Sequence, residues 1–174
     1  NVSNALAAAA CALGLGIAPE AVALGIRSAR FPGMRSEVLS TGRISVIDDS
    51  YNANPASMKA ALSLLSSSPH ACRAAVLGDM LELGGESAHW HEEVGKWAAL
   101  SGIGMLVVTG DMAQAMAKGA LETGMDPANV HVARDIDDII ERLETLLDRD
   151  ALVLVKASRG MHLDEVVSRI KEVA

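Results

Sequence analysis

Aromatic residues are scarce in this chain: they make up 2% of its 174 residues, although half of all residues are hydrophobic. Its core must therefore be built from Ala, Val, Leu, Ile and Met. Ala and Leu favour helices, whereas Val and Ile favour strands. The composition predicts a sheet covered by helices, in a chain long enough for one domain with a real core and a short appendage.

The chain also lacks an excess of positive charge. Its net charge of −7 argues against nucleic acid and anionic membrane surfaces as partners, because both are bound by clustered Lys and Arg. No apolar run reaches the roughly 18–20 residues that cross a bilayer, and no secretion signal is recognisable at the start. The two cysteines, Cys11 and Cys72, lie far apart without metal spacing. These features predict a cytoplasmic protein without membrane insertion.

Several motifs are absent as well. The sequence has no G-x-x-x-x-G-K-[ST] phosphate loop and no G-x-G-x-x-G dinucleotide motif. Nothing in it resembles a Ser-His-Asp arrangement or a metal cluster. The chain by itself therefore does not contain the loop that holds ATP phosphates in nucleotide-binding enzymes.

What the chain does contain is an alternation of short apolar strands and helices. This pattern predicts an α/β fold with a Rossmann-like, mostly parallel sheet and helices on both faces. Two strands form a hairpin-like pair around Thr41 and Gly42. The predicted strands cover residues 37–39, 44–47, 74–77, 105–108, 130–132 and 152–155, and the predicted helices cover 55–65, 87–100, 111–122, 135–147 and 161–173. We expect Asp111 to cap the helix that ends at 122.

The first 28 residues predict helices without strands, unlike the rest of the chain. An Ala-rich helix over 1–13 and a second helix over 19–28 precede the breaker cluster Arg30-Phe31-Pro32-Gly33. We therefore expect a helical appendage over 1–28 and the main domain over 29–174. Because the chain begins at Asn1 without a methionine, inside a helix start, we expect it to be a fragment.

Ligands of parallel sheets bind beyond the carboxyl ends of the strands, so the loops there are the places to look. The loop from Asp48 to Pro55 has two carboxylates, an Asn-rich turn, and Tyr51, the one tyrosine of the chain. Asn54 is placed to cap the helix that begins at Pro55. A capped connection explains most of this loop, but an aromatic ring in a loop is also a candidate surface for stacking a base.

A second candidate loop joins the last strand to the last helix. Lys156, Ser158 and Arg159 combine two cations and a hydroxyl near a helix start, which suits carboxylate or phosphate groups. Solvated loop charges are the plain alternative. A third loop, from Gly78 to Gly84, carries two acids but is a weak pattern. His89 and His91 point about 200° apart on a helix, so they cannot share a metal. We expect both at the surface, with a substrate contact from one of them as the alternative.

Taken together, these segments resemble the Mur ligases. The segments that carry the resemblance, which covers nearly the whole chain, are Asn1–Ala5, Pro32–Arg35, Asp48–Pro55 with Ser57-Met58, Leu77–Gly84, Glu86-Ser87 with His91, and Lys156–Arg159 with Met161. Ala157 stands where the family usually has glycine, and Asp164 where a glutamate is common. The sequence Tyr-Asn-Ala-Asn-Pro is similar to the form that this motif takes in the subgroup that adds D-alanyl-D-alanine.

The resemblance implies a three-domain, ATP-dependent amide ligase that joins D-alanyl-D-alanine to UDP-N-acetylmuramoyl-tripeptide through an acyl phosphate. Residues 1–28 would be the tail of the central ATPase domain, and 29–174 the C-terminal domain. The phosphate loop and the Mg²⁺ ligands would belong to the central domain. The fragment would then be inactive alone, and no catalytic residue is assigned within it.

The resemblance also implies binding roles. Asn1 and Asn4 would contact the adenine end of ATP, and Arg35 and Asp49 the ribose and phosphates. Tyr51 and Asn52 would line the same crevice, while Lys156, Ser158 and Arg159 would face the substrate peptides.

Two alternatives stay open from the sequence. One is another ligase of the same chemistry, such as the Mur ligase that adds diaminopimelate or lysine, or folylpolyglutamate synthase. The other is a non-catalytic module that binds a nucleotide or peptide.

Overall fold

The computed structural model describes residues 2–29, 33–41, 44–146 and 149–173. The chain divides into two compact units, Asn1–Pro32 and Gly33–Ala174. The expected boundary at 28/29 thus lies a few residues before the division between the units. Each unit is described by itself below.

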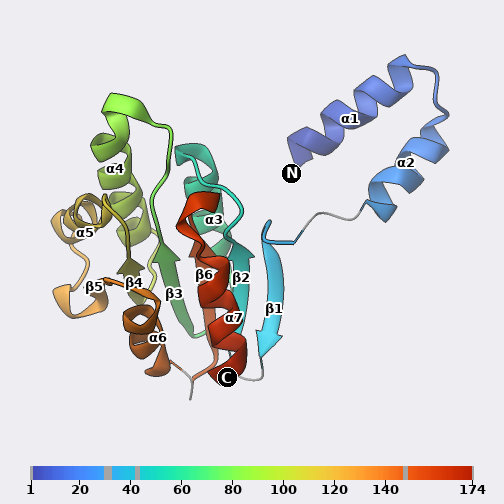
Figure 1. Ribbon diagram of the computed structural model, residues 1–174. Coiled ribbons are helices and arrows are strands. Elements are labelled where there is room, and N and C mark those ends of the chain that lie inside the picture. The colour runs from blue at the N-terminus through green and yellow to red at the C-terminus, as the bar shows by residue number, and fades with distance from the viewer. Residues whose placement is uncertain (1, 30–32, 42–43, 147–148, 174) are drawn as a thin grey trace. The chain divides into compact units, whose positions relative to one another are not determined.

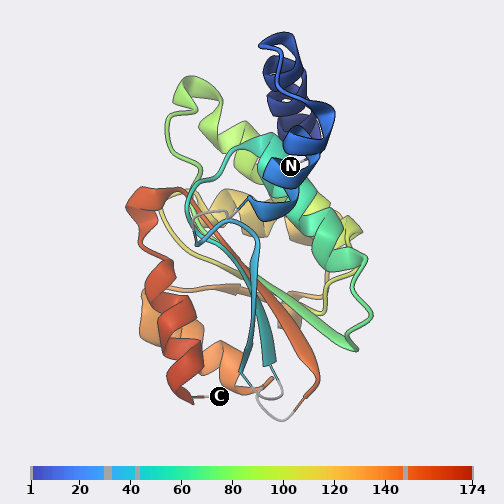
Figure 2. The same ribbon diagram turned by 90° about the vertical axis from the view of Figure 1, so that its right-hand side faces the viewer.

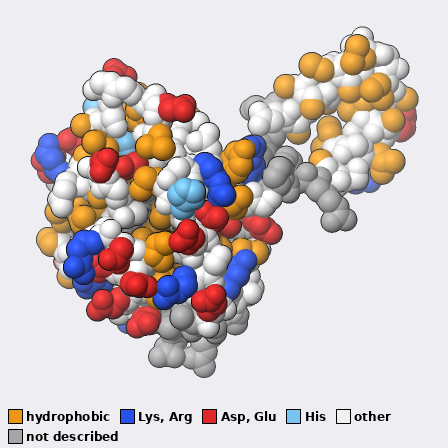
Figure 3. Space-filling model, in the orientation of Figure 1, with side chains coloured by type: hydrophobic (Ala, Val, Ile, Leu, Met, Phe, Trp, Pro, Cys, Tyr) orange, Lys and Arg blue, Asp and Glu red, His pale blue; other side chains and the backbone are white. Residues whose placement is uncertain are grey.

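The first unit is a pair of helices, α1 (Val2–Gly14) and α2 (Pro19–Ser28). Pro19 occupies the first turn of α2, where its fixed φ suits a helix start. Figure 3 shows many hydrophobic side chains on the surface of this pair. Helix α2 has no buried residue. Cys11 is exposed as well. The large exposed side chains are Val2, Leu6, Leu13, Leu15, Ile17, Leu24 and Ile26.

The second unit is built on a six-stranded sheet in the order β1-β2-β6-β3-β4-β5. Among the described strands, only β1 runs antiparallel, to β2, as the predicted hairpin requires; the other pairs are parallel. Figure 1 shows β2 and β3 pointing the same way and β1 the opposite way. The strands are β1 (Glu37–Thr41), β2 (Ile44–Asp49), β3 (Cys72–Leu77), β4 (Met105–Val108), β5 (Val130–Val132) and β6 (Ala151–Lys156).

Helices cover both faces of this sheet, which confirms the predicted fold class. In Figure 2, α6 and α7 lie on one side of the sheet and α3 on the other. Side chains along each strand alternate between two cores: Ala75 and Leu77 face α3, α4 and α5, while Ala74 and Val76 face α6 and α7. The helices are α3 (Pro55–Ser66), α4 (Ser87–Leu100), α5 (Ala113–Glu122), α6 (Ile136–Glu144) and α7 (Asp164–Val173).

Helices α4 and α5 pack unusually closely because two glycines lie at their contact. A Cβ at Gly95 would meet the carbonyl oxygen of Met116, and one at Gly119 would meet that of Glu92. Any larger residue at these positions would force the two backbones apart. This packing keeps the loops before α4 and α5 next to each other at the carboxyl edge of the sheet.

Most predicted element starts are confirmed to within one residue, and three are wrong. Strand β3 begins at Cys72, two residues before the predicted start at 74. Asn54 caps α3 in a reciprocal capping box with Ser57. Helix α5, however, begins at Ala113 without an Asp111 cap, and α7 begins at Asp164 after a short 3₁₀ turn, Arg159–Met161. None of the described helices is long and apolar enough to cross a membrane.

Candidate functional site

A buried ion pair joins the ends of two neighbouring strands at the carboxyl edge of the sheet. Asp49 ends β2 and Lys156 ends β6, and the two residues lie opposite each other in the parallel register. Lys156 Nζ donates to Asp49 Oδ2 at 2.6 Å and to the carbonyl of Asn52 at 2.8 Å. Because the Lys156 side chain is only 2% exposed, its charge depends on these acceptors.

The second oxygen of Asp49 holds the segment that enters the sheet. Asp49 Oδ1 accepts from the backbone N–H of Ser36 at 2.8 Å and from its hydroxyl at 3.2 Å. The Tyr51 N–H donates to the Met34 carbonyl at 3.1 Å. We call Asp49, Lys156, Asn52 and Ser36 the Asp49 cluster. It ties β2, β6 and the segment before β1 into one structure.

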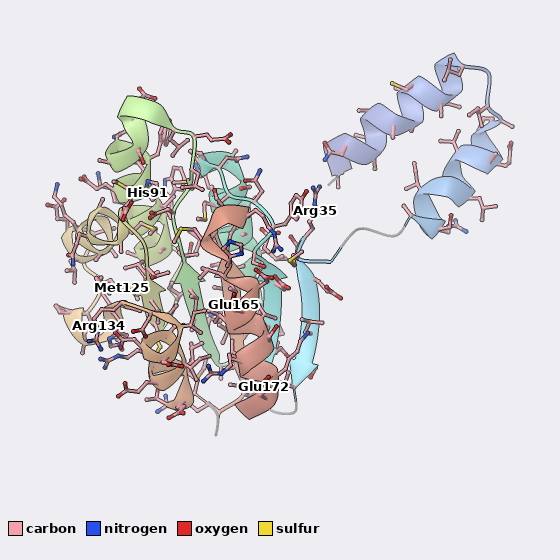
Figure 4. The ribbon with its side chains drawn as sticks, viewed as in Figure 1. Arg35, His91, Met125, Arg134, Glu165 and Glu172 are labelled. Carbon is pink, nitrogen blue, oxygen red and sulfur yellow. The ribbon has the colours of Figure 1, made fainter. Side chains whose placement is uncertain are left out.

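The segment held in this way has a strained backbone. Met34 and Ser36 have φ of 64° and 53°, in the left-handed region that residues with a Cβ seldom adopt. Each such residue costs about 1–2 kcal/mol, and the bonds to Asp49 and Tyr51 offset that cost. The result is a fixed kink that presents Arg35, which lies between the two strained residues. Figure 4 labels Arg35 at this end of the sheet.

Arg35 and Tyr51 form an exposed platform above the Asp49 cluster. The Arg35 guanidinium carbon lies 4.2 Å from the centre of the Tyr51 ring, a cation–π contact, and Tyr51 is 39% exposed. Arg159 reaches the same segment: its Nη1 lies 3.2 Å from Met34 Sδ and 3.0 Å from Asp164 Oδ1. A delocalised cation beside a ring suits anionic and planar groups.

Ser158 belongs to a second cluster nearby. Its hydroxyl accepts from the Leu81 N–H at 2.9 Å, and its own N–H donates to the Asp79 carbonyl at 3.0 Å. The Asp79 carboxylate accepts from the N–H groups of Asp111 at 2.8 Å and Met112 at 3.1 Å. These N–H groups belong to the two residues before α5, so the Asp79 carboxylate, and not the Asp111 side chain, caps the turn that leads into that helix.

His91 completes this second cluster, and the expectation that it lies at the surface is wrong. It is fully buried and belongs to α4, where Figure 4 labels it. Nδ1 lies 2.7 Å from the Ser87 carbonyl, and Nε2 lies 2.8 Å from the Met80 nitrogen. A ring that donates from Nδ1 and accepts at Nε2 is neutral. We call Asp79, His91 and Ser158 the Asp79 cluster; it joins the loops that follow β3, β4 and β6.

The sequence-based candidates thus fall into three places. Arg35, Asp49, Tyr51, Asn52, Lys156 and Arg159 are brought together, so the residues expected at nucleotide and those expected at peptide share one location. Ser158 is 4% exposed and turned into the Asp79 cluster. Asn4 lies in the first unit, and Asn1 lies outside the described residues.

Comparison with known proteins decides the family. The model of the Mur ligase glutamate ligase domain matches residues 34–159. The chain belongs to the Mur ligase family. It is 37% identical, over 99% of its length, to the UDP-N-acetylmuramoyl-tripeptide–D-alanyl-D-alanine ligase of Bacillus subtilis, of which it covers 38%. The chain therefore spans little more than a third of that relative.

Solved structures of Mur ligases share the fold. A crystal structure of MurF from Acinetobacter baumannii superposes with a TM-score of 0.85 at 29% identity, covering 99% of this chain and 37% of that one. MurF from Thermotoga maritima in complex with ADP has a TM-score of 0.77 at 23% identity and covers 94% of this chain and 36% of that one, a likeness of fold.

Both departures from the Mur ligase pattern are accommodated. Ala157 is buried and keeps φ outside the left-handed region. A Cβ at Gly78 would lie 2.9 Å from the Ala157 Cβ, so the extra methyl of Ala157 fits because residue 78 is a glycine. Asp164, the shorter acid, still reaches Arg159. Within the described ranges no three His, Cys, Asp or Glu side chains are grouped to hold a metal ion.

Proposed function

We propose that this chain is the C-terminal part of a UDP-N-acetylmuramoyl-tripeptide–D-alanyl-D-alanine ligase, an ATP-dependent enzyme of cytoplasmic peptidoglycan precursor synthesis. The observation that carries the proposal is 37% identity to such a ligase across 99% of the chain. The Asp49 cluster supports it, because the motif residues that define the resemblance are joined by direct bonds at the ligand-binding edge of the sheet.

In the proposed reaction the tripeptide carboxylate takes the γ-phosphoryl group of ATP, and ADP leaves. The amine of D-alanyl-D-alanine then attacks the acyl carbon; the C–O bond to phosphate breaks and the amine loses a proton. Residues outside this chain would hold the Mg²⁺ and the ATP phosphates. What this chain supplies is a set of positioned cations and polar groups.

Arg35 is the residue most suited to touch the nucleotide. It is exposed, cationic and oriented by the strained kink and by the Tyr51 ring. A pre-oriented guanidinium stabilises charge on a transferring phosphoryl group without further reorganisation. Tyr51 and Asn52 would line the same crevice, and Asn1 and Asn4 would meet the adenine.

Asp49 would serve the site in two ways. Both of its oxygens already accept bonds from Lys156 and Ser36. A carboxylate has about four acceptor positions, so a ribose hydroxyl can still be bound. Lys156 is buried against Asp49 and acts on substrate mainly by holding this loop, whereas Arg159 is half exposed and would face the peptide, with Ser158 behind it.

The first helical unit would be the end of the central domain. Its exposed apolar side chains are typical of a surface that packs against another part of a protein. The proposal thus accounts for a helical pair that has little core of its own, as well as for the share of the relatives that this chain does not cover.

The deciding experiment is a ligase assay on the full-length parent protein. It should form product from UDP-N-acetylmuramoyl-tripeptide, ATP and D-alanyl-D-alanine, and not when diaminopimelate, lysine or glutamate replaces the dipeptide. Product formation with one of those amines instead would assign the chain to another ligase. The 174-residue chain alone should show no magnesium-dependent ATP turnover.

The role of Arg35 can be tested in the same assay. We expect Arg35→Gln in the full-length parent to raise KM for ATP about tenfold, the effect of one charge-assisted hydrogen bond. Arg35→Lys keeps the charge but loses the planar stack, so it should recover part of the loss. An unchanged KM and kcat for Arg35→Gln would remove Arg35 from the site.

A further inference from the structure

A cavity of about 440 Å³ lies at the opposite edge of the sheet from the Asp49 cluster. Cys72 and Met105, the first residues of β3 and β4, line it together with residues of β5 and the end of α6. The strands β3 and β4 therefore run from this cavity to the candidate ligase site. The length of the sheet separates the cavity from the Asp49 cluster, and no residue of that cluster lines the cavity.

The lining of this cavity is strongly basic. Arg73, Arg142, Arg149 and His131 all contribute to it, and none of the lining residues in the described part of the chain is Asp or Glu. This concentration of cations occurs in a chain with a net charge of −7. Three arginines around one hollow repel each other, so an anion between them would stabilise the arrangement.

Among the described residues, the partners that orient Arg73 carry no charge. Its Nη1 donates to the Ser66 carbonyl at 2.8 Å and its Nη2 to the Gly102 carbonyl at 3.3 Å. Both acceptors are uncharged backbone groups that fix the guanidinium plane at the wall of the cavity. A guanidinium has five N–H donors, so Arg73 keeps donors for a ligand.

Arg142 shares its one described acidic partner with another arginine. Asp138 lies 3.1 Å from Arg134 Nε and 3.8 Å from Arg142 Nε. One carboxylate between two cations leaves a net positive charge, and the closer contact goes to Arg134. Arg142 is the member of this pair that lines the cavity; Arg134 is labelled in Figure 4.

The pKa of His131 responds to the positive charge of Arg142. Burial lowers the pKa of the His131 imidazole, and the positive charge of Arg142 lowers it further, while Asp138 opposes the shift. Arg73 and Arg149 line the cavity beside it. An anion placed among these groups would offset the arginine charges and raise the pKa of His131.

We propose that this cavity binds a phosphate-bearing small molecule, with Arg73, Arg142 and Arg149 donating to its phosphate oxygens. The planar fork of arginine matches two phosphate oxygens at once, and several arginines together favour a doubly charged group. The volume lies within the roughly 300–1,000 Å³ of small-molecule sites, which leaves room for more than the phosphate. This site is independent of the proposed ligase function.

Inorganic pyrophosphate is a suitable probe for the 174-residue chain, with binding followed by calorimetry. Arg142→Gln should weaken binding about tenfold, the effect of one charge-assisted hydrogen bond. The matched control is Arg134→Gln, which removes the same charge from the same Asp138 but does not line the cavity, and should change binding less than twofold. Arg149→Gln, an exposed position, should resemble Arg142→Gln. Circular dichroism checks that each variant is folded.

Equal weakening by Arg142→Gln and Arg134→Gln would overturn the proposal, since it would show attraction to net charge alone. Absence of pyrophosphate binding by the unaltered chain would also overturn it. Malonate, which carries two carboxylates, should bind at least about tenfold more weakly; equal affinity would refute the assignment to phosphate. In nuclear magnetic resonance titrations, pyrophosphate should raise the pKa of His131, and no change there would contradict the location.

Discussion

The Asp49 cluster and the Asp79 cluster lie at the same edge of the sheet, yet they use polar groups differently. The Asp49 cluster buries a charged pair and supports an exposed platform of Arg35 and Tyr51. The Asp79 cluster turns a neutral imidazole and a serine hydroxyl inward, where their bonds go to backbone N–H and C=O groups between the end of β3 and the start of α4.

This difference separates two tasks within one edge of the sheet. In the Asp49 cluster, the carboxylate that accepts hydrogen bonds from the strained segment is itself paired with Lys156, so the geometry of that segment depends on charge. Hydrogen bonds to backbone in the Asp79 cluster set the loop paths themselves. We therefore expect substitutions in the first cluster to alter binding as well as stability, and those in the second to act mainly through stability.

The largest expected effect is from Lys156→Met, which keeps the aliphatic stem and removes the charge. It leaves the Asp49 carboxylate without its cation, and the loss of one partner of a buried ion pair costs about 3–5 kcal/mol. Urea unfolding of the 174-residue chain would measure this loss. The control is Arg169→Met, which breaks the exposed pair of Arg169 with Asp137 and should cost about 1 kcal/mol or less.

If Lys156→Met lowers the free energy of unfolding by less than about 1 kcal/mol, the buried Asp49–Lys156 pair contributes no more than an exposed surface pair. That result would contradict the special role given to charge in the Asp49 cluster. A double-mutant cycle with Asp49→Asn isolates the coupling. Strong coupling is expected, since the two side chains contact each other directly at 2.6 Å.

The next largest loss of stability is expected from Gly110→Ala, because the added methyl group would crowd Asp79 in the Asp79 cluster. Gly110 has φ of +105°, and a Cβ there would lie 2.6 Å from the Asp79 carboxylate. Backbone strain of about 1–2 kcal/mol adds to a weakened cap of about 0.5–2 kcal/mol.

Gly124→Ala separates these two contributions. Gly124 has φ of +95° but nothing within 4 Å of the added Cβ, so this variant should show the strain alone. Thermal unfolding of both variants would give the difference. If the two substitutions cost the same, the Asp79 cap contributes little to the loop before α5.

A smaller loss is expected from His91→Leu. The substitution leaves the buried Met80 N–H without its acceptor, which costs about 1–3 kcal/mol. His89→Leu on the same helix changes an exposed residue and should stay within about 0.5 kcal/mol. Unfolding by urea tests the stability, and the ¹⁵N shifts of His91 should report a neutral ring protonated at Nδ1.

The smallest effect concerns an exposed ion-pair group between α4 and α5. Hydrogen bonds from Lys118 and then Lys96 lower the pKa of Glu92 from 4.5 to about 2. Its contribution to stability is present above pH 4.5 and lost as the pH falls towards 2, since the unfolded state takes up the proton first. Glu92→Gln should flatten the dependence of stability on pH in this window.

Because Glu92 is at the surface, 0.5 M salt should reduce the same pH dependence, whereas the effect of Lys156→Met should persist in salt. Equal salt sensitivity of both would contradict the contrast between the exposed pairs and the buried Asp49 pair. Acid titrations of stability with and without salt provide the measurement.

Local sequence signals predicted most of the fold. The helix over 87–100 and the strand over 105–108 were expected with the bounds that the structure has. The Asn54 cap was expected from an Asn before a Pro, and the antiparallel β1 from the hairpin at 41. Each of these features depends on residues within a few positions of one another, so the pattern of the chain carries them.

The candidate site was predicted only in part. The loops were found because polar residues follow strand ends, but the pairing of Asp49 with Lys156 joins residues 107 positions apart. His91 was expected at the surface, because its partner, the Met80 N–H, is identified by nothing in the local pattern. Asp111 was expected to cap α5, but Asp79 reaches that helix from another loop.

By itself the sequence determined the alternation of strands and helices, the division into a helical segment and a sheet domain, and the motifs that mark a Mur ligase. These follow from periodicity, capping and loop chemistry, which are local. The tertiary structure decided which polar groups are buried and which remain exposed. Strand order and loop contacts set those bonds, because the free energy of a buried charge or imidazole depends on neighbours that the fold alone brings within reach.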